Sequence, residues 1–128
     1  SAKGMAKRLA SFSGYDVLIL DLTDVPQIDY SSSRALDEML RDAQDSEREI
    51  FLIGCKPQVC NMLIKQGVMA KLQAARLDMN RMEALKEGLL LIRERLQSDV
   101  DNQKVLGVGE GWSLAREFHQ HESQLKDD

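Results

Sequence analysis

The sequence predicts an α/β fold in which helices flank a sheet of mainly parallel strands. Residues 17–20 (VLIL) and 50–53 (IFLI) are continuous apolar runs, which is typical of strands buried on both faces of a sheet. Each run is followed by apolar residues at helical spacing, and no hairpin signal joins the two runs. Strands that alternate with helices favour right-handed crossovers and therefore parallel pairing.

The composition indicates an ordinary globular chain. Of the 128 residues, 43% are hydrophobic and 30% are charged, so we expect one soluble domain with its own core. The net charge of −4 comes from 17 basic and 21 acidic residues, and no basic stripe stands out, which argues against a nucleic-acid partner. No apolar run approaches the ~18 residues that cross a bilayer, so direct membrane insertion is not expected.

The first predicted elements are a helix, a strand and a second helix. Residues 2–10 carry apolar side chains at helical spacing, and Gly14 ends this helix. After the strand at 17–20, Pro26 prevents the ladder from continuing, and Asp29 with three serines offers caps for the next helix. The apolar stripe of that second helix consists of Ala35, Leu36, Met39, Leu40 and Ala43.

Two more helices are predicted after the strand at 50–53. Pro57 falls in the first turn of one of them, and Gly67 stands just past its end. Residues 68–77 give a weak signal, and a strand near 75–77 is the candidate there. Asn80 is expected to cap the last helix, which should pack on the sheet because its apolar seam lasts barely two heptads. That seam consists of Met82, Leu85, Leu89, Ile92 and Leu96.

We expect residues 1–97 to form the folded domain and residues 98–128 to be a linker and tail. Residues 98–102 are polar, and Gly107, Gly109 and Gly111 follow at alternate positions. A phosphate-binding glycine loop would follow a strand, and no convincing strand precedes this run, so the glycines are interpreted as a flexible joint. Residues 112–125 are predicted to form one short amphipathic helix, before an acidic and disordered end.

The two cysteines are expected to be reduced thiols. Cys55 follows the strand at 50–53, and Cys60 lies within the next helix, where each acts as a small apolar residue. Zinc would require further ligands, and the histidines of the chain, His119 and His121, are in the polar tail. A metal site at the cysteines is therefore rejected.

Little in the sequence supports catalysis. No Cys/His or Ser/His pair falls near the predicted strand ends, so no catalytic, cofactor-binding or metal-binding residue is assigned. Asp21, Asp24 and Asp29 cluster after the first strand, as magnesium ligands do in some α/β folds. Capping and turn formation are the favoured interpretation, because Asp performs both routinely.

Residues 21–36 (DLTDVPQIDYSSSRAL) resemble the central segment of STAS domains, a module shared by sulfate-type anion transporters and anti-sigma factor antagonists. The pattern is a buried strand ending in Asp-Leu, a Val-Pro turn, and an Ile-Asp-x-Ser/Thr segment that opens a helix. Residues 50–54, 57–59, 63–67 and 80–85 are similar to later parts of that family, so the resemblance covers about residues 1–97. It implies a STAS-like sheet, of which the strands that normally precede the first helix are missing here.

Within that family, residues 1–5 and the turn at 24–26 are most similar to the carboxyl-terminal domain of SulP-type anion transporters. The resemblance implies a non-catalytic module for regulation or dimerisation, on the cytoplasmic side of the membrane as part of a transporter for sulfate or a related anion. The implied partners are the membrane domain of the transporter, a second STAS domain, or both.

Two alternatives stay open. One is a free regulator like the anti-sigma factor antagonists, although Tyr30 stands at the position of their phosphorylated serine and Ser31 comes one place later. The other is a small nucleotide- or anion-binding enzyme. The predicted regulatory or partner-binding loop consists of Asp29, Tyr30, Ser31, Ser32 and Ser33, with a plain helix cap as the competing interpretation.

Overall fold

The computed structural model describes residues 14–72, 79–94, 104–109, 112 and 114–119. Its elements, in chain order, are β1 (Val17–Asp21), α2 (Tyr30–Asp45), β2 (Glu49–Ile53), α3 (Pro57–Lys65), the 3-10 helix η1 (Val68–Lys71), α4 (Arg81–Glu94), β3 (Lys104–Gly109) and β4 (Leu114–His119). The predicted helix at 2–10, the candidate strand near 75–77 and the acidic end lie outside the described residues.

Strand β1 lies in the interior of a sheet whose described strands are ordered β2-β1-β3-β4. It pairs in parallel with β2 on one side and with β3 on the other, so that Leu18 is in register with both Ile50 and Leu106. Strand β4 pairs antiparallel with β3 and lies at the edge of the described sheet. The predicted α/β fold with a mainly parallel sheet is therefore confirmed.

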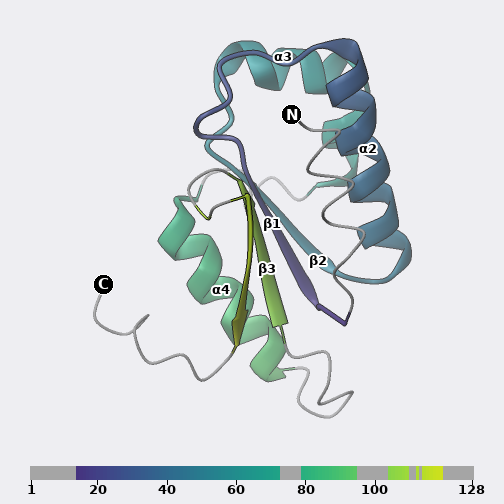
Figure 1. The fold of residues 1–128 in the computed structure, drawn as a ribbon. Helices are drawn as coiled ribbons and strands as arrows, with labels where there is room; N and C mark the ends of the chain where they lie inside the picture. Colours follow the sequence, from purple (N-terminus) through teal and green to yellow (C-terminus); the bar gives the residue numbers. More distant parts are fainter. Residues whose placement is uncertain (1–13, 73–78, 95–103, 110–111, 113, 120–128) are drawn as a thin grey trace.

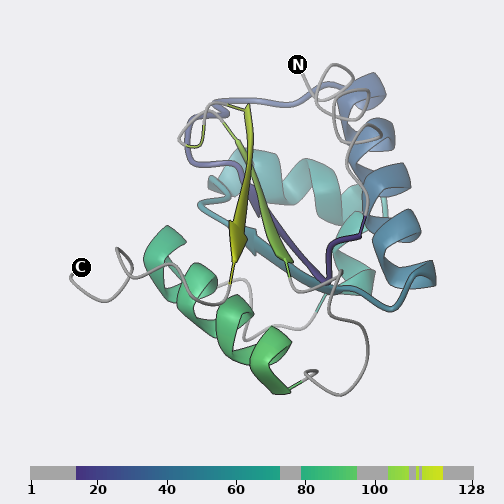
Figure 2. The same ribbon diagram turned by 60° about the horizontal axis from the view of Figure 1, so that its bottom comes forward.

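Helices cover both faces of this sheet (Figures 1 and 2). Because successive strand residues point to opposite faces, Leu18 and Leu20 of β1 join a core beneath α2 and α3. Val17 and Ile19 point the other way and join a second core beneath α4. All five residues of β1 are buried, as the continuous apolar run predicted.

The three described α-helices begin where the sequence placed their start signals. Asp29 is the N-cap of α2, and Pro57 occupies the first turn of α3. Before α4, the Asn80 side chain accepts from the backbone N–H of Glu83 at 2.8 Å, and Glu83 accepts from the backbone N–H of Asn80 at 2.9 Å. This reciprocal pair is a capping box, which fixes the first turn of α4 at the sheet.

The prediction of a flexible joint and a short helix after residue 103 was wrong for the described residues. Gly107 and Gly109 lie inside β3, and residues 114–119 form strand β4 rather than part of a helix. Together β3 and β4 form a hairpin in the same sheet as β1, with Val105 opposite Phe118. One of the two sheet partners of β1, strand β3, thus comes from a segment that was predicted to be linker and tail.

Gly107 was interpreted as part of a flexible joint because its role depends on a tertiary contact that the local sequence does not indicate. A Cβ atom at Gly107 would lie 2.1 Å from Cε3 of Trp112, so only glycine leaves room for the indole against the strand. Trp112 is 7% exposed and meets Phe118 edge to face, with ring centroids 5.8 Å apart. Glycine therefore serves here as a packing surface within a strand, and not as a source of flexibility.

Candidate functional site

The candidate site lies at the carboxyl ends of the parallel strands. At this edge of the sheet β1 and β2 end, and α2, α3 and α4 begin. Parallel strands joined by helices bring these ends together, and ligands of open α/β sheets commonly bind at such an edge. The predicted regulatory loop lies here, because Asp29 to Ser33 form the cap and first turn of α2 (Figure 1).

Asp29 fixes the start of α2. Its backbone is extended, and its side-chain oxygen Oδ1 accepts from the backbone N–H of Ser32 at 2.7 Å. This hydrogen bond, followed by a further one from the Ser32 side chain, lowers the pKa of the Asp29 carboxyl. The aspartate is therefore charged at neutral pH, next to the positive end of the helix dipole.

Of the remaining residues of the predicted loop, Ser32 is partly exposed and is held by Asp29, and the other three fall into two groups. Tyr30 and Ser31 are exposed, and the Tyr30 side chain retains 62% of its accessible surface. Ser33 is fully buried, and its hydroxyl donates to the carbonyl oxygen of Tyr30 at 2.8 Å. The loop thus presents an outward surface at Asp29, Tyr30 and Ser31, whereas Ser33 belongs to the architecture of the helix start.

The three aspartates considered for magnesium have separate surroundings. Asp29 caps α2, Asp24 is exposed, and the Asp21 side chain is only 2% exposed at the end of β1. Among the described residues, no group of three or more His, Cys, Asp or Glu side chains has the arrangement of a metal site.

Asp21 is held by groups from two elements. Oδ1 accepts from the hydroxyl of Thr23 and from its backbone N–H, the latter at 3.0 Å, while Oδ2 lies 2.7 Å from both Nε and Nη2 of Arg81. Burial alone would raise the pKa of Asp21, but the hydrogen bonds from Thr23 and the interaction with Arg81 outweigh it and hold the pKa below 3.8. The buried carboxylate therefore remains ionised at neutral pH.

Arg81 was not predicted as a residue of this edge. It stands 60 positions after Asp21, at the start of α4, and its guanidinium also lies 5.1 Å from the centroid of the Trp112 ring. An arginine directly after a helix cap gives no local signal of such a partner. Arg81 thereby connects β1 and α4 with Trp112, which lies between β3 and β4 in the chain.

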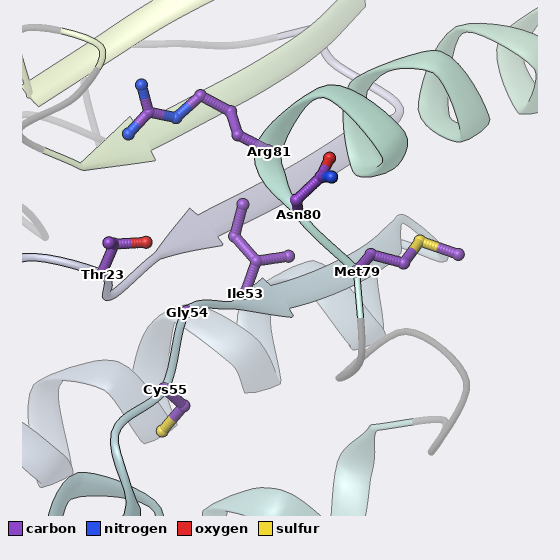
Figure 3. A pocket seen from close by; sticks show the side chains of 7 residues that line it. All are labelled: Thr23, Ile53, Gly54, Cys55, Met79, Asn80 and Arg81. Carbon is purple, nitrogen blue, oxygen red and sulfur yellow. The ribbon is translucent and has the colours of Figure 1, made fainter.

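A cavity of about 440 Å³ opens between these elements (Figure 3). Thr23, Gly54, Cys55 and Ile53 border it from the ends of β1 and β2, and the start of α4 borders it from the other side. The residues contributed on that other side are Met79, Asn80 and Arg81. Its lining thus mixes apolar side chains with a hydroxyl, an amide and a guanidinium.

The turn before α3 holds the loop that leads to α2. The Nζ atom of Lys56 donates to the carbonyl oxygen of Thr23, and Nε2 of Gln58 donates to the carbonyl oxygen of Pro26 at 3.0 Å. Both side chains come from the first residues of α3 or the residue before it. The segment between β1 and α2, which precedes the predicted regulatory loop, is therefore tied to the start of α3.

Comparison with known proteins identifies the family. The STAS domain family matches residues 1–84, which is more than half of the chain. The chain belongs to the STAS domain family. This confirms the resemblance drawn from residues 21–36, and it assigns the edge formed by β1, α2 and α4 to a STAS domain.

Two relatives of this STAS domain carry the name bicarbonate transporter BicA. The protein from Picosynechococcus sp. is 29% identical over 99 residues, which cover 77% of this chain and 18% of the relative. The protein from Synechocystis sp. is 26% identical over 91 residues, which cover 71% of this chain and 16% of the relative. The chain therefore spans less than a fifth of the length of these relatives.

Among the helices that the structure describes, none has both the length and the apolar character needed to cross a bilayer.

Proposed function

We propose that this STAS domain is a non-catalytic regulatory module of an anion transporter, and that it acts on the cytoplasmic side of the membrane. The observation that carries the proposal is the similarity to bicarbonate transporters across 77% of the chain. The match is to a small part of a much longer protein, which fits a domain attached to a transport unit. The regulated anion is then bicarbonate, sulfate or a chemically related species.

The proposed contact surface is the start of α2, at Asp29, Tyr30 and Ser31. These residues are exposed at the start of α2, and Tyr30 offers a large ring of the kind that often anchors protein interfaces. The partner is the membrane domain of the transporter or a second copy of the STAS domain. Neither partner requires chemistry from this edge, only a surface of fixed shape.

The test is anion uptake by the transporter that carries this domain, with Tyr30→Glu or Ser31→Asp introduced. A charge at the centre of a contact surface weakens association, so uptake should change several-fold in both variants. Thermal unfolding of the 128-residue chain should be unaffected, because an acidic side chain suits the start of a helix.

Gln44→Glu is the matched control, since it adds the same charge at an exposed position near the other end of α2. Uptake by this variant should equal that of the unmodified transporter. If Tyr30→Glu and Ser31→Asp also leave uptake unchanged at equal protein levels, the proposed contact surface is wrong.

A second candidate is a free STAS regulator that is controlled by phosphorylation. Ser31 favours it, because this serine is exposed in the first turn of α2, where backbone N–H groups and the helix dipole stabilise a phosphate. The two candidates differ in the surrounding gene. Membrane-spanning segments in the same reading frame support the transporter module, and a short stand-alone reading frame supports the free regulator.

A further inference from the structure

The two cysteines occupy defined positions at the start of α3. Lys56 is the N-cap of this helix and makes no side-chain capping hydrogen bond, and Pro57 is the first helical residue. Cys55 therefore stands immediately before the cap, and Cys60 is the fourth residue of the helix. Side chains at these two positions commonly pack against each other as a staple that sets the angle at which the chain enters the helix.

The contacts place the Cys60 thiol against the backbone of Cys55. The Cys60 sulfur lies 3.5 Å from the carbonyl oxygen of Cys55, while the Cys60 backbone N–H bonds the Lys56 carbonyl at 2.8 Å. Both cysteines are free thiols of intermediate exposure, so reagents in solvent can reach them. Figure 3 shows Cys55 among the residues that line the cavity.

The surroundings favour the protonated form of Cys55. Burial raises the pKa of its thiol to about 12, and a hydrogen bond with the Cys60 side chain adds to this effect. Cys55 is therefore almost entirely a thiol at neutral pH and is a poor nucleophile until it loses its proton.

We propose that Cys55 and Cys60 form a redox-active staple, which closes to a disulfide by exchange with a small disulfide compound. The Cys60 thiolate attacks one sulfur of the compound, forming a mixed disulfide and releasing one thiolate. Cys55 then loses its proton to solvent and attacks the Cys60 sulfur, which expels the second thiolate. Two electrons pass from the cysteines to the compound, which leaves as two thiols.

Closure would act on the turn that holds the segment between β1 and α2, just before the predicted regulatory loop. Lys56 and Gln58 lie inside the ring that the disulfide would close, and these two side chains bind the Thr23 and Pro26 carbonyl oxygens. The staple thus lies next to both the cavity and the β1–α2 loop. The exchange chemistry itself depends on the contact between the two cysteines and does not require the transporter role.

The experiment is a redox titration of the whole chain with oxidised and reduced glutathione, followed by acid quenching, alkylation and intact mass measurement. We expect the native chain to lose two hydrogen atoms and both alkylation sites, and to recover them with dithiothreitol. The same titration in concentrated urea measures how readily two cysteines five positions apart form a disulfide in the unfolded chain. Native contact should raise the disulfide equilibrium constant roughly tenfold or more above the urea value.

Cys55→Ser and Cys60→Ser are the matched variants, since each retains one thiol. Cys55→Ser, which retains Cys60, should accumulate a mixed disulfide with glutathione, and Cys60→Ser should do so more slowly because its remaining thiol is protonated. Circular dichroism of the reduced variants establishes that they are folded. The proposal is overturned if the native equilibrium constant is equal to or below the urea value. It is equally overturned if the unmodified chain gives mixed disulfides or disulfide-linked dimers instead of an internal bond.

Discussion

The Nη2 atom of Arg81 lies 2.7 Å from Oδ2 of Asp21, and this contact joins the first residue of α4 to the last residue of β1. The carboxylate is nearly inaccessible, whereas the guanidinium retains 38% of its surface. The indole of Trp112 lies against the same guanidinium. One arginine therefore links the central strand, the helix on one face and the β3–β4 hairpin.

Replacing Arg81 by Met should destabilise the fold, because the buried charge of Asp21 would then depend on Thr23 alone. Breaking a buried pair costs about 3–5 kcal/mol, and the partial exposure of Arg81 reduces this to about 2 kcal/mol. Urea denaturation measures the change. Arg93→Met, at an exposed position in the last turn of α4, is the control and should cost about 0.5 kcal/mol or less. Equal costs at the two positions would contradict the role assigned to Arg81.

The same pair predicts how stability depends on pH. The folded-state pKa of Asp21 is lower than its unfolded value of 3.8, so the unfolded chain binds more protons in the acid range. The contribution of Asp21 to the free energy of unfolding is thus complete above pH 3.8 and is lost as the pH falls through the folded-state pKa. Urea denaturation between pH 7 and pH 3 should show a shallower acid loss for Asp21→Asn than for the unmodified chain. Parallel curves for the two chains would be inconsistent with an ionised Asp21.

Secondary-structure elements that are specified by residues close together in the chain could be predicted from the sequence. The apolar run at 17–20, the proline at the start of α3 and the Asn80 cap each depend on neighbours in the chain, and all three were confirmed. The β3–β4 hairpin was not predicted, because Gly107 makes sense only beside Trp112.

In the candidate site, too, local contacts could be predicted from the sequence and contacts between distant residues could not. The sequence was sufficient to place Asp29 at the start of α2, since capping is a local interaction. It gave no indication that Arg81 would meet Asp21 across 60 positions. It also grouped Ser31 with Ser33, because the burial that separates them arises from the direction in which each side chain leaves the helix.

Gly107→Ala should destabilise the protein by about 2–3 kcal/mol, because the added methyl group would overlap the Trp112 ring. Gly67→Ala is the control: it has a positive φ of 74° but no atom within 4 Å of the added Cβ, so it measures backbone strain alone, about 1 kcal/mol. Chemical denaturation compares the two variants. In a Trp112→Leu background the cost of Gly107→Ala should fall, since the clash is removed. An undiminished cost there would mean that the glycine serves another purpose.

The two serines of the α2 start should respond differently to removal of the hydroxyl. Ser33→Ala leaves the carbonyl oxygen of Tyr30 without its buried donor and should cost about 1 kcal/mol in urea denaturation. Ser31→Ala alters an exposed position by the same single atom and should change stability by about 0.5 kcal/mol or less. Ser33→Thr does not rescue the loss, because a fully buried site has no space for the extra methyl group. Equal losses of stability in the two alanine variants would mean that both serines have the same environment. The outward surface at Asp29, Tyr30 and Ser31 would then also include Ser33.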